Sequence, residues 1–325
     1  MLSKVMLTSL LMVSPLASQS IRAEDAAADK PEPLRILTFN VYSDWRAPDD
    51  GVAARASGLE KTLMKLRPDV AALQEVSAFW WSSPIFARLE PVYGIVRGDL
   101  EDALRRAGPP QPPRPGKKTP KPANYVPMLY RKDRLKMLDS GFDIFHISLA
   151  LDGFGKGITW AVFEDRRNGR RFMSFSTHFW FKHNGPESDA IRELNVRHVL
   201  WRVADVRRKW GDIPVIGGGD LNSVPGSLAH ETFKREGYSN AMDVAEEKTA
   251  RSATRTFHGR LKQDEKGKYH GTTCPPGKDK PEQSLDHIFF TGGIRALKYD
   301  IDLDKETLDV SDHSPVVVDF VFEKK

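Results

Sequence analysis

The chain has 325 residues, of which 40% are hydrophobic and 29% charged, and its formal net charge is +5. This composition is typical of a folded globular protein and excludes a disordered or collagen-like chain. The single cysteine, Cys274, excludes an intramolecular disulfide and a multi-thiolate metal site. The apolar stretch at 5–13 is too short to span a bilayer as a helix, which excludes a polytopic membrane protein.

The N-terminus has the successive regions of a secretory signal peptide. Lys4 precedes the apolar stretch, and small or helix-breaking residues follow it up to Ala23. We therefore expect a signal peptide at 1–23, a flexible linker at 24–33 and a single domain at 34–323. A short membrane anchor or a misassigned start is the alternative. Export predicts a secreted or periplasmic location.

Short runs rich in β-branched and aromatic residues predict strands along the whole domain. They lie at 34–42, 69–76, 125–131, 158–165, 170–179, 213–222, 284–290, 296–303 and 314–322. Amphipathic helices are expected at 52–67, 189–210 and 227–236. The second of these has Leu194 in its apolar stripe, and the third is capped by Ser227 and ended by Gly237. The pattern predicts mixed α and β structure.

The segment 105–121 has an unusual composition, with six basic residues, six prolines and no acidic residue. Such a segment predicts a solvated, polyproline-like loop with concentrated positive charge. One interpretation is that this loop binds a polyanion. The other is an insertion that only keeps the protein soluble, and the sequence does not decide between them.

Polar residues fall at or just beyond the ends of the predicted strands, where sites form in layered α/β folds. They are Asn40, Glu75, His178, Asp220, Asn222, Asp286 and His313. A carboxylate that leaves a buried strand, as Glu75 does, needs a partner because an isolated buried charge is costly. A metal ion and a salt bridge to Arg or Lys are the two alternatives.

Asp220 and Asn222 follow three glycines, which permit close approach to the backbone. A carboxylate can orient or deprotonate a water, and an amide can donate to a phosphate oxygen, as hydrolysis of a phosphate ester requires. An ordinary Asx-turn is the alternative.

Two Asp-His pairs, Asp286 with His287 and Asp312 with His313, lie near the C-terminus. An Asp on one strand beside a His on another would orient the imidazole and support its positive charge. A purely structural histidine is the alternative for each pair and for His178.

Taken in order, the motifs TFN, LQE, STH, GGGDLN, SLDH and SDHSP resemble those of the endonuclease/exonuclease/phosphatase family, the deoxyribonuclease-I-like superfamily. The resemblance covers residues 34–322. It implies an α/β fold, a four-layer α/β/β/α sandwich with two central mixed sheets, and makes 34–323 a catalytic domain. It also implies a metal-dependent hydrolase that acts on phosphate ester bonds.

The resemblance further implies a role for each matched residue. Asn40 and Glu75 would bind a divalent cation, Mg²⁺ or alternatively Mn²⁺, with Asp312 as a further contributor. The implied catalytic residues are His178, Asp220, Asn222, Asp286 and His313.

Each implied catalytic residue has its own task. Asp220 would position or activate the attacking water, Asn222 would hold the phosphate, and His178 would stabilise the pentacovalent phosphate. Asp286 would orient His313, whose role as base or electrophile stays open.

Members of the superfamily cleave DNA, RNA, phosphoinositides and sphingomyelin, so the substrate needs separate cues. The basic segment 105–121 favours nucleic acid. An aromatic cluster could stack bases, enter a membrane interface or simply be core; it comprises Phe79, Trp80, Trp81, Ile85 and Phe86.

We therefore expect a nuclease whose partner is nucleic acid. A lipid phosphodiesterase acting on membrane lipid, or a phosphomonoesterase, is the alternative, and a non-catalytic binding module is a third. No obligate protein partner is expected.

Overall fold

The computed structural model describes residues 32–43, 48–108, 123–152, 156–259, 261–263, 269–272 and 281–323. Contacts within the chain divide it into two units, Met1–Glu32 and Pro33–Lys325. The predicted signal peptide and most of the predicted linker lie outside the described residues, as does Cys274. Within the described ranges, no helix is both long and apolar enough to cross a membrane.

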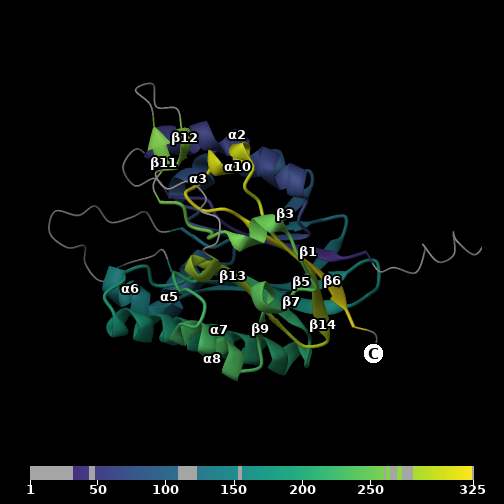
Figure 1. Ribbon diagram of the computed structural model, residues 1–325. Coiled ribbons are helices and arrows are strands. Elements are labelled where there is room, and N and C mark those ends of the chain that lie inside the picture. Colours follow the sequence, from purple (N-terminus) through teal and green to yellow (C-terminus); the bar gives the residue numbers. More distant parts are fainter. Residues whose placement is uncertain are drawn as a thin grey trace, which may run out of the picture. The chain divides into compact units, whose positions relative to one another are not determined.

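Two mixed sheets form the centre of the second unit (Figure 1). The larger sheet contains, in spatial order, β10 (Glu247–Lys248), β14 (Ile294–Ile301), β15 (Val316–Phe322), β1 (Leu34–Asn40), β2 (Val70–Gln74), β4 (Met128–Arg131) and β3 (Tyr93–Val96). The smaller contains β5 (Leu135–Ile144), β6 (Gly157–Asp165), β7 (Arg171–His178), β8 (Val215–Asp220), β13 (Asp286–Thr291) and β9 (Ser239–Asn240). A separate pair comprises β11 (Leu261–Gln263) and β12 (Tyr269–Thr272).

Helices cover the outer faces of both sheets (Figure 1). Those beside the larger sheet include α2 (Pro48–Leu66), α3 (Ala78–Ser82), α4 (Ile85–Leu89) and α10 (Lys305–Leu308). Those beside the smaller sheet include α5 (Leu100–Ala107), α6 (His146–Asp152), α7 (Pro186–Trp210) and α8 (Leu228–Arg235). The remaining elements are α9 (Ala241–Val244) and the 3₁₀ turns Ala250–Ala253 and Pro281–Gln283.

Four apolar clusters lie among the described residues, and the three largest hold these layers together. Residues of β1 and β2 pack against α2, α3 and α4 in one core. Residues of β6, β7 and β8 pack against α7 and α8 in another. The third core lies between the two sheets and draws on both of them. The predicted four-layer α/β/β/α sandwich is therefore confirmed.

Alternate residues of a strand point to the same face of its sheet. On the inner faces of both sheets, these residues change from apolar to polar along the strands. On β1, Leu34 and Ile36 belong to the core between the sheets, and Thr38 follows them. On β7, Phe172 belongs to the same core and Ser176 follows. Both polar residues are buried, and Gln74 on β2 links them, accepting from Thr38 Oγ1 at 3.2 Å and donating to Ser176 Oγ at 3.1 Å. The apolar interior therefore ends in a polar region near one end of the strands.

Every predicted strand and helix has a counterpart, but several details of the predictions were wrong. Leu194 is 49% exposed on α7 rather than part of its buried stripe. Ser227 occupies the N-cap position of α8, yet its side chain makes no cap hydrogen bond. Gly237 follows the end of α8 with a φ of 80°, as a helix terminator should. The strands β3 and β5 were not predicted.

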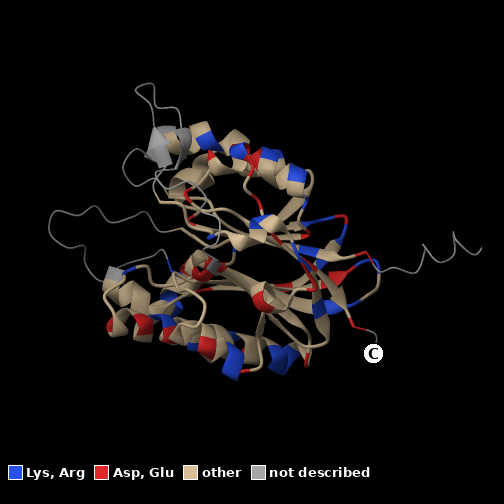
Figure 2. Ribbon diagram, in the orientation of Figure 1, with Lys and Arg blue, Asp and Glu red and all other residues tan. Residues whose placement is uncertain are grey.

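The structure also changes the interpretation of two features from which the sequence analysis inferred the substrate. Arg105 and Arg106 belong to α5 rather than to a solvated loop, and both pair with Asp102; 109–121 lies outside the described residues. The aromatic cluster is largely core, with Trp80 and Phe86 buried among α2, α3 and α4. The helix α7 carries charges of both signs, with two acidic residues in its first turn and three basic residues in its last (Figure 2).

Candidate active site

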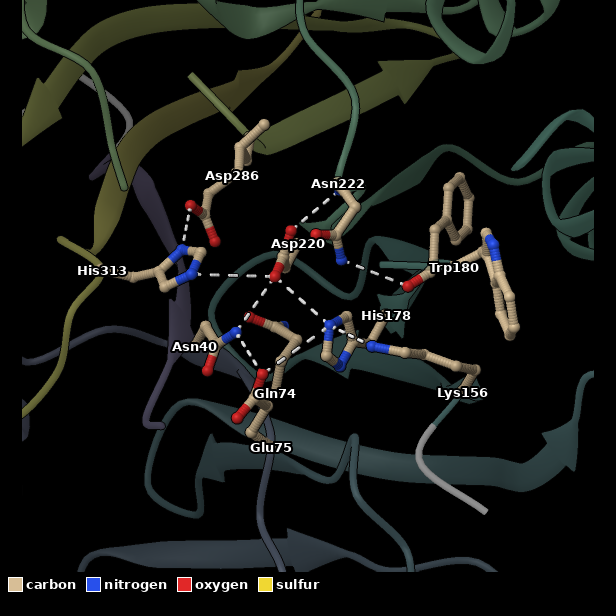
Figure 3. A network of polar contacts seen from close by, with 12 residues as sticks. Asn40, Gln74, Glu75, Lys156, His178, Trp180, Asp220, Asn222, Asp286 and His313 are labelled. Atoms are coloured by element: carbon tan, nitrogen blue, oxygen red, sulfur yellow. Dashed lines mark hydrogen bonds and ion pairs between the residues drawn. The ribbon is translucent and has the colours of Figure 1, made fainter. Parts of the chain in front are cut away.

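The predicted site residues meet where the inner faces turn polar, although their positions span most of the chain (Figure 3). Pairing of the strands explains this, because Asn40 is in register with Gln74 across β1 and β2. Asp220 is in register with His178 on one side and with Asp286 on the other. His313 lies just before β15 and forms an isolated bridge with Phe257.

The backbone is left-handed at three residues that follow these strand ends. Tyr42, Glu75 and Asn222 have φ values of 58°, 61° and 47°. Such conformations cost non-glycine residues energy and persist where surrounding contacts hold them. Here the backbone N–H of Ser43 donates to Glu75 Oε2 at 2.7 Å, and that of Asn222 donates to Asp220 Oδ1 at 2.8 Å. The Asx-turn considered as an alternative at Asp220 is thus present, within the site itself.

The glycines of β8 permit close packing of its neighbours. A Cβ atom on Gly218 would lie 1.8 Å from the carbonyl oxygen of His287, and one on Gly219 would lie 1.8 Å from that of Thr177. Gly219 also has a φ of +157°. Side chains at these positions would push β7 and β13 away from β8 and separate His178 and Asp286 from Asp220.

Glu75 lies at the accessible side of the cluster, with 24% of its side chain exposed. Asn40 Nδ2 donates to Glu75 Oε1 at 3.2 Å and to Asp220 Oδ2 at 3.0 Å, so this amide joins the two carboxylates. In the described part of the chain, no Arg or Lys forms an ion pair with Glu75. The salt-bridge alternative for Glu75 therefore has no support here.

His178 contacts a residue that the sequence analysis did not identify. Lys156 Nζ lies 2.5 Å from His178 Nε2, and that ring nitrogen lies 3.3 Å from Asp220 Oδ2 and 4.0 Å from Glu75 Oε1. Burial and the nearby Lys156 ammonium lower the pKa of His178. Lys156 stands alone before β6, and no motif or periodicity in the sequence marked it.

His313 and Asp286 form the pair expected from two different strands. His313 Nδ1 lies 2.7 Å from Asp286 Oδ2, and its Nε2 faces Asp220 Oδ2 at 3.9 Å. Burial alone would lower the pKa of His313, but Asp286, Asp220 and Asp312 raise it to about 10. His287 points elsewhere, with its Nε2 2.9 Å from the carbonyl oxygen of Ser284.

Negative charge dominates this buried region. Burial would raise the pKa of Asp220, but His178, His313 and Lys156 lower it overall. The pKa of Asp312 rises to about 7, chiefly because the residue is buried and also because Glu75 is near. A divalent cation would offset such a concentration of carboxylates.

The donor set fits a divalent cation. Ligand atoms of Glu75, His178 and Asp220 lie within 4.8 Å of one another, as do those of Asp220, Asp286 and His313. In addition, the described residues offer no hydrogen-bond partner to the buried Asp286 Oδ1. Carboxylate oxygens are the ligands that Mg²⁺ and Mn²⁺ prefer.

Three predicted residues take positions that differ in detail from their expected roles. Asp312 is buried beside the site, but neither group of converging ligand atoms includes it. Asn40 turns its amide nitrogen toward the carboxylates, while its Oδ1 accepts from the backbone N–H of Tyr42 at 2.9 Å. Asn222 donates through Nδ2 to the carbonyl oxygen of Phe179 at 3.2 Å.

Several solved structures have a fold similar to that of this chain. An endonuclease/exonuclease/phosphatase from Bacteroides vulgatus has a TM-score of 0.67 at 22% identity, over 90% of this chain and 100% of that chain. A mannosyl-6-phosphatase from Bacteroides thetaiotaomicron has a TM-score of 0.62 at 17% identity, over 89% and 100%. D. rerio TDP2 complexed with a single-strand DNA product has a TM-score of 0.55 at 18% identity, over 90% and 100%.

These identities are low, so the solved structures establish the fold alone. Comparison with curated proteins gave no match. The sequence profile of the Endonuclease/Exonuclease/phosphatase family matches residues 37–313, which include every predicted site residue. The chain therefore belongs to the endonuclease/exonuclease/phosphatase family, and the protein is a metal-dependent hydrolase of phosphate esters.

Proposed function

We propose that this protein is an exported, Mg²⁺-dependent phosphodiesterase that cleaves nucleic acid. The observation that carries the proposal is that two groups of ligand atoms share Asp220, with Glu75 and His178 on one side and Asp286 and His313 on the other. A phosphoryl group bound between them would meet a cation site and a hydrogen-bonded histidine together.

Glu75, with Asp220 and His178, would hold the cation. When bound, the cation would stabilise the negative charge that develops on the phosphoryl oxygens. Asp220 is suited to orient the attacking water, because the backbone N–H of Asn222 and the amide of Asn40 fix its two oxygens. Asp286 fixes the His313 ring, whose Nε2 faces Asp220 at the same centre.

Lys156 adds a positive charge on the other side of Asp220. Its Nζ contacts His178 and is among the groups that lower the pKa of Asp220. An ammonium group in a buried site is a strong donor to a phosphate oxygen. We therefore assign Lys156 to phosphate binding, beside His178.

Two observations favour nucleic acid as the substrate. Phe257 packs its ring against His313 at a centroid distance of 5.0 Å and remains 37% exposed, so it offers an aromatic surface beside the site. The similar solved structure of D. rerio TDP2 is complexed with a single-strand DNA product, which supports a nucleic-acid substrate for this chain. The aromatic cluster around Trp80 is mostly core, so it supports neither base stacking nor a membrane interface.

The proposal can be tested by hydrolysis assays on the purified mature chain. The panel comprises single-stranded DNA, plasmid DNA, RNA, sphingomyelin vesicles and mannose 6-phosphate, each with Mg²⁺, with Mn²⁺ and with chelator. We expect Mg²⁺-dependent cleavage of a nucleic acid, weakening as salt is added because phosphate contacts release counterions. N-terminal sequencing of the exported protein would test cleavage after Ala23.

Two variants and a control make the test specific. Glu75→Gln and His313→Ala should remain folded but lose hydrolysis. The control is Glu231→Gln, which replaces Glu by Gln at a remote position on α8 and should not alter activity. Turnover of only sphingomyelin or mannose 6-phosphate would overturn the nucleic-acid assignment. Wild-type activity in Glu75→Gln would overturn the assignment of the site.

A further inference from the structure

The segment after β7 holds an exposed aromatic ring next to His178. Phe181 is 43% exposed, whereas the neighbouring Phe179 and Trp180 are buried. The rings of Trp180 and Phe181 have centroids 5.6 Å apart and planes inclined by 50°. Phe181 therefore rests on a buried indole and presents the rest of its ring to solvent.

Polar contacts to α7 fix this segment. Arg192 Nε donates to the carbonyl oxygen of Trp180 at 3.0 Å, and Arg192 Nη2 donates to that of Lys182 at 2.5 Å. Asn195 Oδ1 accepts from the backbone N–H of Trp180 at 3.1 Å. Because Arg192 binds the carbonyls on both sides of Phe181, the backbone that carries the ring is held in place.

Two ammonium groups accompany the ring. Lys156 Nζ lies 5.3 Å from the Phe181 centroid, and Lys182 Nζ lies 5.7 Å from it. Lys156 Nζ also contacts His178 Nε2. Lys156 thus links the ring to the phosphoryl site, and Lys182 Nζ also lies 5.0 Å from the centroid of the Trp180 ring.

We propose that Phe181 and Lys182 form a subsite for the nucleotide next to the scissile phosphate, with its base stacked on Phe181 and its other phosphate near Lys182. This subsite rests on the proposed function. A nucleotide combines a planar base with an anionic phosphate, which is the complement of an exposed aromatic ring with an ammonium beside it. Sugar phosphates lack the planar group, so the subsite would select strands of nucleic acid.

Substitutions in the protein, combined with removal of single bases from the substrate, test the subsite. The substrate is a short oligonucleotide with one cleavable phosphodiester, intact or with an abasic nucleotide on either side of that bond. We expect Phe181→Ala to lower kcat/KM on the intact strand about 10- to 100-fold, mainly through KM. At one of the two abasic positions, wild type and Phe181→Ala should become equal.

Further variants separate stacking from a structural effect. Phe181→Trp should keep or improve kcat/KM, because indole also stacks. Trp201→Ala removes an aromatic ring that is 52% exposed on α7, away from the site, and should change nothing. Lys182→Gln should reduce the slope of log kcat/KM against log salt by about one phosphate contact.

The outcomes distinguish the subsite from the proposed function. If the wild type does not cleave the intact strand, both fail. If the wild type cleaves it and Phe181→Ala does so equally well, the subsite alone fails. An equal loss in Phe181→Ala at both abasic positions and on the intact strand would also overturn the subsite, because the loss would not depend on a base.

Discussion

Two buried polar clusters lie at opposite ends of the same strands, and they differ in how their charges are balanced. At the end opposite the active site, Arg134 makes a bidentate pair with Asp165, at 2.9 Å for both contacts, and both side chains are buried. Asp69 lies 3.2 Å from Arg131, and Arg35 makes a second bidentate pair with Asp319. Each carboxylate in this arginine cluster has a guanidinium partner.

In the active-site cluster, the carboxylates outnumber the cations. Among the described residues, Glu75, Asp220, Asp286 and Asp312 share one ammonium, that of Lys156, and two imidazoles, and the Arg55 guanidinium acts on Asp312. Breaking a matched ion pair costs stability, whereas a cluster with excess negative charge is suited to binding a cation. We therefore expect the arginine cluster to stabilise the fold and the active-site cluster to carry out the hydrolysis.

The largest expected effect is that of Asp220→Asn, which removes the carboxylate shared by both groups of ligand atoms. Because Asp220 would both bind the cation and orient water, we expect kcat/KM to fall about 10⁴-fold. The measurement is single-substrate kinetics over a range of Mg²⁺ concentrations. Recovery of wild-type rates at high Mg²⁺ would restrict Asp220 to metal binding and contradict its role in orienting water.

The matched change at the other end is Arg134→Met, which keeps most of the side-chain volume and leaves Asp165 buried without its partner. Removal of one member of a buried pair costs about 3 to 5 kcal/mol of unfolding free energy. Chemical denaturation measures this loss, and kcat/KM below the transition should stay at the wild-type value. A large loss of activity without a loss of stability would break the contrast between the two clusters.

The sequence predicted the active-site cluster better than its surroundings. Glu75, Asp220 and His313 stand beside short apolar runs that predict strands, so their positions at strand ends could be inferred. The unpredicted β5 (LKMLDSGFDI) lacks such a run, and a register irregularity between Met137 and Asp139 interrupts its pairing with β6. Burial of a charge by distant segments leaves no local pattern, and Lys156 was missed for this reason.

Helix signals failed where the helices are short. The helices α3 and α4 have five residues each, which is too few to show a period, so the sequence did not decide whether their aromatic residues belong to the core or to a binding surface. Arg105 and Arg106 looked like the start of a loop because prolines follow them. In the structure, Asp99 caps α5 by accepting from the backbone N–H of Asp102, and Asp102 pairs with both arginines.

Lys156→Met tests whether the one ammonium of the active-site cluster serves phosphate binding. Loss of one preorganised donor to a developing charge costs about 10²-fold in rate. We expect kcat/KM to fall by about this factor, and Lys156→Arg to restore part of it because the positive charge remains. Equal activity of Lys156→Met and wild type would make Lys156 a structural residue beside His178.

The smallest expected effect is on the free energy of unfolding at acid pH, and it comes from a histidine outside both clusters. His230 is buried on α8 with its ring against those of His287 and Phe289. Burial, with the neighbouring His287 and Lys234, lowers the pKa of His230 to about 2. An unfolded histidine has a pKa of about 6.5, so below that pH the unfolded chain binds a proton that the folded chain does not. This contribution to stability is therefore present at neutral pH and is lost progressively as the pH falls below about 6.5.

His230→Leu should remove that proton and flatten the dependence of the unfolding free energy on pH by about 1.4 kcal/mol per pH unit between about pH 6 and pH 4. Denaturation midpoints over this range, in wild type and variant, measure the difference in slope. Leu63→Ala on α2 serves as the control, because it should lower stability without removing or unpairing a titratable group, and so keep the wild-type slope. If His230→Leu also keeps that slope, the acid sensitivity comes from other titratable groups: the buried His198 and His258, whose pKa values burial also lowers, and the carboxylates of the two clusters.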